Sequence, residues 1–449
     1  MKKQLPAALA VLFTTQLALA HGGAPQVKYI RFPPQAGGAA WLMDELGLLA
    51  QVPEGFAWLC DDSVSALVGF EIVAPIDATT WVLSTRAGVF RTEDRGCSYT
   101  QVPGVLTEHV TAGLSPHPDR PLELVTATAT LGIPNDVFRT VDGGLTWQAA
   151  GLESSTRIRS FVRSEADPQV LYASHGAGAS RSDDGGARFA PIALGPDPAL
   201  LPDPTPVRPE EFRFLATSPV TPLEVVAVIE RFPKSFLVHS YDGGASWQHT
   251  FSLEDSPDGL VFTNDGTGLL MSTPFLGLFR STDGGRQWVS VPAPGIIGCL
   301  ARNPATGHIW ACGRGRPLPW VAASTPDLGE SWAVALAQYA DLAAGWECPE
   351  GSPTALACAR QCPPADPACM PPDGGVTDGG VADGGLDGGV DGGRDAGPDG
   401  GPGAAESAQP NTGGGSDGGC ASGGPPAGGG WLALALGALL MNRGRRRRF

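Results

Sequence analysis

An eight-residue pattern that recurs six times constrains the fold of this chain more than any other feature. Each copy reads Ser or Thr, any residue, Asp, any residue, Gly, any two residues, and an aromatic residue. Successive aspartates are separated by 48, 42, 58, 41 and 44 residues, close to the length of one four-stranded blade of a β-propeller. The copies are Thr92–Tyr99, Thr140–Trp147, Ser182–Phe189, Ser240–Trp247, Ser281–Trp288 and Thr325–Trp332.

Every residue of this pattern, here called the repeat turn, suits a tight hairpin. The aspartate and the hydroxyl residue can accept hydrogen bonds from backbone amides of their own turn. The later glycine supplies a positive φ, and the aromatic residue opens the next strand and can pack beneath the turn. We therefore predict structural roles, not catalytic ones, for Asp94, Gly96, Asp142, Gly144, Trp147, Asp184, Gly186, Asp242, Gly244, Trp247, Asp283, Gly285, Trp288, Asp327, Gly329 and Trp332.

The segments around each turn predict four strands per repeat. Before the second turn, for example, alternating apolar runs cover His109–Ser115, Leu122–Thr130 and Asp136–Val141, and a fourth strand follows the turn.

A degenerate seventh copy precedes the six. Residues 51–58 keep the glycine and tryptophan in register but place Pro53 where the aspartate belongs, 41 residues before Asp94. We predict an all-β, seven-bladed propeller within residues 21–345. Because a proline-rich insertion at 196–209 lengthens one interval, six or eight blades are the alternatives.

The N-terminus predicts export. Lys2 and Lys3 precede an apolar stretch that ends in Ala18-Leu19-Ala20, which is typical of a cleaved signal peptide over residues 1–20. The formal net charge of −16 disfavours nucleic acid and anionic lipid headgroups as partners.

Cysteine use fits an exported protein. The chain has nine cysteines, and eight in its body are consistent with four disulfides. No spacing indicates a metal site, so we predict neither metal nor cofactor. The eight are Cys60, Cys97, Cys299, Cys312, Cys348, Cys358, Cys362 and Cys369.

The C-terminal part differs from the rest in composition. Residues 346–370 form a cysteine-rich segment that we expect to pack on the propeller. Residues 371–419 are rich in Asp-Gly-Gly and predict a disordered spacer. Within 420–449, an apolar stretch at Trp431–Met441 followed by arginines predicts a short hydrophobic helix that attaches the chain to a membrane.

The repeat turns resemble the Asp-box, or BNR, repeats of sialidases, sortilin-type receptors, xyloglucanase-type glycosidases and photosystem II assembly-factor propellers. The N-terminal part resembles a class of myxobacterial surface propellers at His21–Gly23, Leu46–Leu49, Trp58–Cys60 and Gly88–Cys97. This resemblance implies a disulfide from Cys60 to Cys97 between the first two blades. Cys299 and Cys312 are expected to pair across adjacent strands, and the last four cysteines to staple the segment after the final blade.

The C-terminus resembles the myxobacterial sorting signal MYXO-CTERM. Gly418-Gly419-Cys420, the apolar stretch and the basic end carry this resemblance. It implies cleavage near Cys420 by a sorting protease, display on the outer membrane, and lipidation of Cys420. An ordinary tail anchor is the alternative.

The sequence offers little chemistry. Ile30-Arg31-Phe32-Pro33 matches the arginine motif of sialidases, but Tyr339 is the one late tyrosine candidate and no glutamate motif accompanies it. His21 at the mature N-terminus could chelate copper with its amine, yet no partner-histidine motif is visible. Paired carboxylates of a glycosidase cannot be selected from the sequence. We predict a non-catalytic binding, adhesion or scaffold module for an extracellular protein or glycan, with a glycoside hydrolase as the alternative.

Overall fold

A computed structural model describes residues 26–33, 36–45, 47–64, 72–107, 109–315 and 319–359. The chain divides into two compact units, residues 1–382 and 383–449, and the second lies wholly outside the described residues. The predicted signal peptide, the spacer, Cys362, Cys369 and the C-terminal sorting signal with Cys420 also lie outside them.

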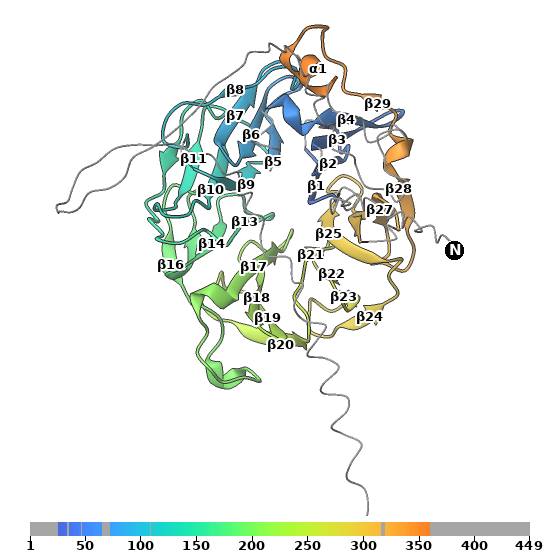
Figure 1. Cartoon of the computed structure of the whole chain (residues 1–449). Coiled ribbons are helices and arrows are strands. Elements are labelled where there is room, and N and C mark those ends of the chain that lie inside the picture. Colours follow the sequence, from blue (N-terminus) through green and yellow to red (C-terminus); the bar gives the residue numbers. More distant parts are fainter. Residues whose placement is uncertain are drawn as a thin grey trace, which may run out of the picture. The chain divides into compact units, whose positions relative to one another are not determined.

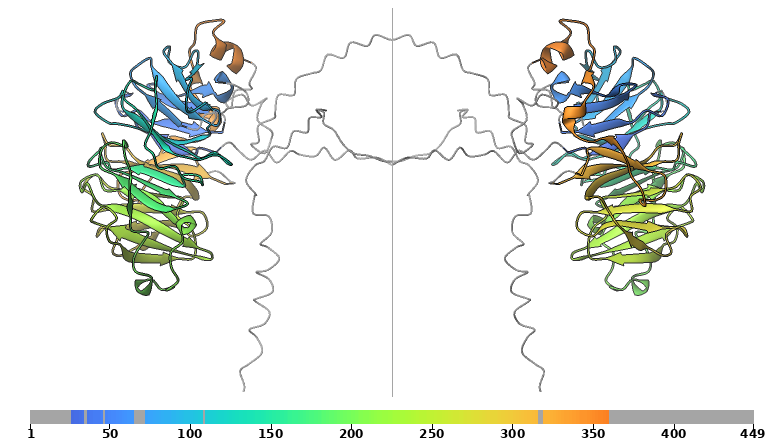
Figure 2. Two further views of the ribbon diagram at one scale, coloured as in Figure 1. Left: turned by 90° about the vertical axis from the view of Figure 1, so that its left-hand side faces the viewer. Right: turned by 90° about the vertical axis from the view of Figure 1, so that its right-hand side faces the viewer.

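Seven sheets surround a common axis and form a seven-bladed β-propeller (Figure 1), which confirms the predicted fold and blade count. In each blade four consecutive strands pair antiparallel in chain order, and the first strand lies innermost. The views from the side show the sheets next to one another around the ring (Figure 2).

Blades 1 to 4 come from the first half of the chain. Blade 1 contains β1 (Tyr29–Arg31), β2 (Trp41–Asp44), β3 (Gly47–Val52) and β4 (Gly55–Cys60); blade 2 contains β5 (Ile72–Pro75), β6 (Trp81–Thr85), β7 (Gly88–Thr92) and β8 (Thr100–Gln101); blade 3 contains β9 (Thr111–Pro116), β10 (Leu124–Thr128), β11 (Val137–Thr140) and β12 (Gln148–Ala149); blade 4 contains β13 (Ser160–Arg163), β14 (Leu171–His175), β15 (Gly178–Ser182) and β16 (Ala190–Ile192).

Blades 5 to 7 complete the ring. Blade 5 contains β17 (Phe212–Thr217), β18 (Val225–Arg231), β19 (Lys234–Ser240) and β20 (Gln248–Leu253); blade 6 contains β21 (Gly259–Phe262), β22 (Leu269–Thr273), β23 (Gly277–Ser281) and β24 (Val289–Val291); blade 7 contains β25 (Ile296–Arg302), β26 (Ile309–Arg314), β27 (Ala322–Thr325) and β28 (Ala333–Leu336). The short remaining elements are β29 (Ala344–Gly345), helix α1 (Pro353–Cys358) and the 3-10 helices η2 (Asp61–Ser63), η3 (Pro198–Leu200), η4 (Pro209–Glu211) and η5 (Tyr339–Asp341).

The repeat turns join the third and fourth strands of blades 2 to 7, and all six share one hydrogen-bond pattern. The Ser or Thr hydroxyl donates to the aspartate at 2.7–2.9 Å. It also accepts from the amide of the later glycine at 2.7–3.0 Å. The carboxylate accepts from the amide four residues further on at 2.8–3.0 Å.

These contacts hold the six turn carboxylates ionised. At Asp283 the amide of Gln287 makes the largest contribution and lowers the pKa. At the other five, burial is the largest single influence and raises the pKa, but the combined hydrogen bonds outweigh it, so the pKa is lowered, to about 2 for Asp327. Each turn is therefore a closed structural unit with its acceptors already used.

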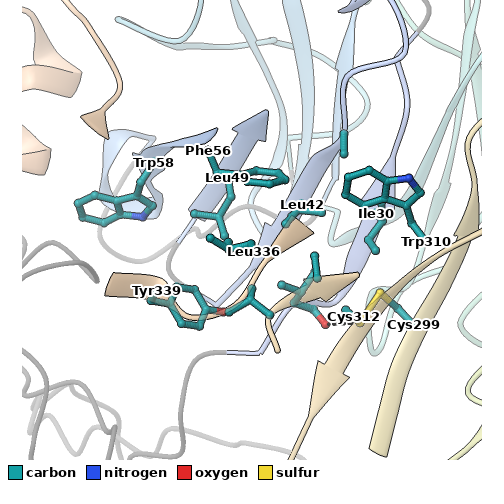
Figure 3. Packing of buried hydrophobic residues seen from close by; sticks show 14 of the residues in the cluster. Ile30, Leu42, Leu49, Phe56, Trp58, Cys299, Trp310, Cys312, Leu336 and Tyr339 are labelled. Atoms are coloured by element: carbon teal, nitrogen blue, oxygen red, sulfur yellow. Dashed lines mark hydrogen bonds between the residues drawn. A yellow bond between two sulfur atoms is a disulfide. The ribbon is translucent and has the colours of Figure 1, made fainter. Parts of the chain in front are cut away.

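Seven hydrophobic clusters lie between neighbouring blades, one at each of the seven interfaces. The cluster that joins the last blade to the first contains Leu42, Phe56 and Trp58 from blade 1 and Trp310 and Leu336 from blade 7 (Figure 3). Because every strand alternates its side chains between its two faces, each sheet contributes to two clusters. Burial of these apolar side chains stabilises the ring.

The C-terminal segment returns to the start of the propeller. Strand β29 pairs parallel to β4 and becomes a fifth strand at the edge of blade 1. Beyond it, Thr354 donates to the carbonyl of Gly96 at 2.6 Å and the Trp346 indole to that of Arg95 at 2.8 Å. The segment therefore contacts both blade 1 and blade 2.

The path of this returning segment determines which cysteines form disulfides. The expected Cys60–Cys97 bond is wrong: Cys60 is bonded to Cys358, and Cys97 to Cys348. The returning segment places a cysteine of its own beside each of them, which no spacing in the sequence reveals. The Cys299–Cys312 bond between β25 and β26 is confirmed.

Candidate functional site

A cavity of about 820 Å³ lies on the propeller axis, lined by residues from the innermost strands of all seven blades. Its walls combine polar groups with apolar side chains, among which Phe161, Leu215 and Leu300 are partly exposed. Concave sites of this size commonly hold small-molecule ligands. The axial cavity is therefore the candidate functional site.

Three arginines occupy equivalent positions in this cavity. Arg31, Arg163 and Arg302 are each the last residue of the innermost strand of their blades, namely β1, β13 and β25. Because the innermost strands all run in the same direction along the axis, their carboxyl ends meet at one end of the cavity. We call this end the arginine end.

Arg31 is a cation without a counter-ion in the described part of the chain. Its Nε atom is buried and has no hydrogen-bond partner, and no ion pair to its guanidinium is formed there. Burial lowers the pKa of Arg31, because a charged group loses hydration inside the protein. Such a group is costly unless an anion compensates it.

Arg163, by contrast, is held by the protein itself. Its Nε donates to the Ser115 hydroxyl at 3.0 Å, one Nη to the Ser115 carbonyl at 3.2 Å, and the other Nη to the carbonyl of Pro168. Burial lowers its pKa to about 10, so Arg163 stays protonated at neutral pH. It contributes positive charge to the arginine end from a fixed position.

Arg302 pairs with a carboxylate from the far side of the axis. Its guanidinium contacts Glu165 and also the side-chain oxygen of Asn264. Glu165 follows β13 in blade 4, whereas Arg302 ends β25 in blade 7, so this ion pair bridges the cavity. The Arg302 side chain is 7% exposed and that of Glu165 46% exposed. Burial raises the pKa of Glu165, and Arg302 opposes this rise.

A second charged cluster lies at the opposite ends of the innermost strands. Glu230 accepts from Arg159 and, at 2.9 Å, from Arg213. Asp258 pairs with Arg314 at 2.9 Å. Burial is the largest influence on both carboxylates: it raises the pKa of Asp258, whereas at Glu230 the arginines and Ser256 outweigh it and lower the pKa.

The structure separates the residues of the sialidase hypothesis. Arg31 lines the cavity, but Tyr339 is buried in the cluster between blades 7 and 1, where burial and Asp44 raise its pKa (Figure 3). Among the described residues that line the cavity there is no tyrosine, and Glu165 is the single carboxylate. A tyrosine–glutamate nucleophile pair is therefore not assembled there.

Sequence reasoning missed Arg163, Glu165, Asn264 and Arg302. A signal was present, because aligning the repeats on their innermost strands places an arginine at the last strand position in three blades. The repeat turns lie between the third and fourth strands and carry no information about the innermost strands. His21, the basis of the copper hypothesis, lies outside the described residues.

No group of histidine, cysteine or carboxylate side chains within the described residues could hold a metal ion. Within the same residues, no helix is long and apolar enough to cross a membrane.

The chain matches no known protein family and no curated protein. Its fold is similar to that of an ancestral GH74 enzyme, at 16% identity and a TM-score of 0.53 over 71% of this chain and 47% of that chain. It is also similar to the GH74 xyloglucanase from Xanthomonas campestris, at 17% identity and a TM-score of 0.51 over 71% of this chain and 55% of that chain. The chain thus spans about half the length of these enzymes. At such identity the likeness concerns the propeller fold alone.

Proposed function

We propose that this protein is an extracellular, non-catalytic binding module that takes its ligand at the arginine end of the axial cavity. The observation that supports this role is the chemistry of the cavity. Its described lining combines apolar walls with three guanidinium groups and one carboxylate, which is already ion-paired. Such a lining offers donors and surface to a ligand, but not the two carboxylates of a typical glycosidase.

A glycan array with product analysis tests this role. The purified, disulfide-intact protein should bind some extracellular glycans or envelope components and release no product from them. Arg31→Gln should weaken the binding of these glycans or envelope components, because Arg31 lines the cavity. Release of sugar from a bound glycan would contradict a non-catalytic role.

The alternative is a glycoside hydrolase, favoured by one specific observation. Glu230 and Asp258 lie at the other end of the axis and their pKa values are shifted in opposite directions, as in an acid and base pair. Each is also ion-paired with arginine, which uses part of its capacity. If turnover is found, its loss in both Glu230→Gln and Asp258→Asn would assign it to this pair, whereas loss in Arg31→Ala with these two variants active would assign it to the sialidase-like site.

We also propose that the protein is displayed on the cell surface. The three disulfides formed among the described residues indicate an oxidising compartment, and the repeat turns and the C-terminal motif resemble those of Asp-box propellers with a MYXO-CTERM-like signal. Cleavage near Cys420 predicts that the intact mass of the native protein lacks Trp431–Phe449. A native protein that retains this segment would instead favour an ordinary tail anchor.

A further inference from the structure

We propose that the ligand of the axial cavity is an organic carboxylate, and that its carboxyl group is bound by Arg31 and Arg302 in place of Glu165. This inference rests on the proposed binding role and names the chemical class of its ligand.

The charge of the site is the first argument. The whole chain has a formal net charge of −16, yet the described cavity lining carries three arginines and a single acid. Positive charge concentrated at the centre of an acidic protein is not needed for its solubility. Clefts of one sign with apolar walls focus the field and attract ligands of opposite charge.

The second argument is the unsatisfied donors. The buried Nε atoms of Arg31 and Arg302 have no hydrogen-bond partner. Arg163 already donates three hydrogen bonds to Ser115 and Pro168, so its main contribution to the site is positive charge at a fixed position. An anion at the arginine end would compensate the charge of Arg31, whose guanidinium has no ion pair among the described residues.

The third argument is the carboxylate that already occupies the site. Glu165 reaches Arg302 from the opposite side of the axis, which shows that a carboxylate fits there. Since Glu165 is 46% exposed and Arg302 only 7% exposed, Glu165 is the partner that can move into solvent. A ligand carboxylate that replaces Glu165 would keep the buried Arg302 guanidinium compensated, so the exchange leaves no unpaired buried charge at Arg302.

The cavity walls indicate the chemistry of the ligand beyond its carboxyl group. Partly exposed apolar side chains, among them Phe161, Leu215 and Leu300, line the same cavity as the arginines, and its volume of about 820 Å³ accommodates a body of small-molecule size. A planar guanidinium binds a carboxylate through two parallel hydrogen bonds. A carboxylate attached to an uncharged, partly apolar body therefore fits best.

Ligand-observed NMR titrations of the purified, disulfide-intact protein test this. Benzoate and glucuronate serve as carboxylate probes, methyl benzoate as the neutral counterpart, and inorganic phosphate as the competing anion. We expect at least one carboxylate to bind and methyl benzoate to bind more weakly, by roughly 10- to 100-fold.

Three variants make the test specific. Arg31→Gln should weaken carboxylate binding by roughly 10- to 100-fold, since a charged hydrogen-bonding partner is lost. Glu165→Gln should strengthen it, because the internal competitor loses its charge. Arg188→Gln removes an exposed arginine of blade 4 outside the cavity and should leave the affinity unchanged. If Arg31→Gln does not fold, Arg31→Lys keeps the charge without the planar fork and should still weaken binding.

The proposal is overturned if no carboxylate binds either the wild-type protein or Glu165→Gln, if phosphate alone binds, or if a folded Arg31 variant keeps its affinity. Such a failure would not change the result of the glycan array. The protein would then still be a binding module, but one whose ligands are neutral. Product release on the array would instead remove the binding role without changing these titrations.

Discussion

Gly144 illustrates why the repeat turn requires glycine at its second glycine position. Its φ is +86°, in the left-handed region that residues with a side chain rarely adopt. A Cβ atom there would also lie 2.9 Å from a methyl group of Val82 in the preceding blade. The glycine therefore serves both the turn and the contact between blades. The sequence predicted the first role but not the second.

Gly144→Ala should lower the free energy of unfolding by about 2–5 kcal/mol, the sum of left-handed strain and overpacking against Val82. Gly151→Ala is the matched control, because Gly151 has a φ of +76° but no atom within 4 Å of the added Cβ. It should lose only about 1–2 kcal/mol. Denaturant unfolding measures both. Equal losses would show that the contact with Val82 is unimportant.

Among the elements, the hairpin of blade 1 shows how one sequence position can be filled by different chemistry. β3 and β4 pair without interruption from Gly47 opposite Cys60 to Val52 opposite Gly55, so Pro53 and Glu54 alone form the turn. Neither residue has a positive φ, and the proline ring presets a φ of about −65°, which suits the first central position of a type I or type II turn. The alignment of residues 51–58 with the repeat turns predicted this hairpin correctly, although the segment lacks the aspartate of the other six turns.

The innermost strands explain the axial cavity in the same way. Each ends at the same level, so a residue at the last strand position of any blade faces the residues of the others. Three arginines at this position line one cavity only because the blades form a ring.

For the molecule as a whole, closure of the ring is the decisive feature. Blade 1 is formed by the start of the propeller chain, and blade 7 ends at Leu336. The two blades meet through a hydrophobic cluster. β29 and the disulfides of Cys348 and Cys358 then bind the returning segment to blades 2 and 1. The two disulfides link residues 298 and 251 positions apart and hold the returning segment covalently against blades 1 and 2. We call this pair of bonds the latch.

Replacing Cys60, Cys97, Cys348 and Cys358 by serine should release this latch. In the chain-entropy description, removing links across such long loops costs about 5 kcal/mol or more, compared with about 3 kcal/mol for the link across 13 residues between Cys299 and Cys312. The midpoint temperature of thermal unfolding should therefore fall further in this variant than in Cys299→Ser/Cys312→Ser. Limited proteolysis of the variant should cleave residues 337–359. Continued protection of that segment, with equal losses of stability, would argue against a latch.

The sequence by itself determined the blade count, the strand positions and the chemistry of the turns. These depend on residues within about one blade length, since hairpin hydrogen bonds and strand alternation are local. Only the tertiary structure decided the partners of Cys60 and Cys97, the presence of three arginines in one cavity, and the pairing of Arg302 with Glu165 across 137 residues. Each of these contacts joins parts of the chain that approach one another only after the ring closes, so no local pattern in the sequence could specify them.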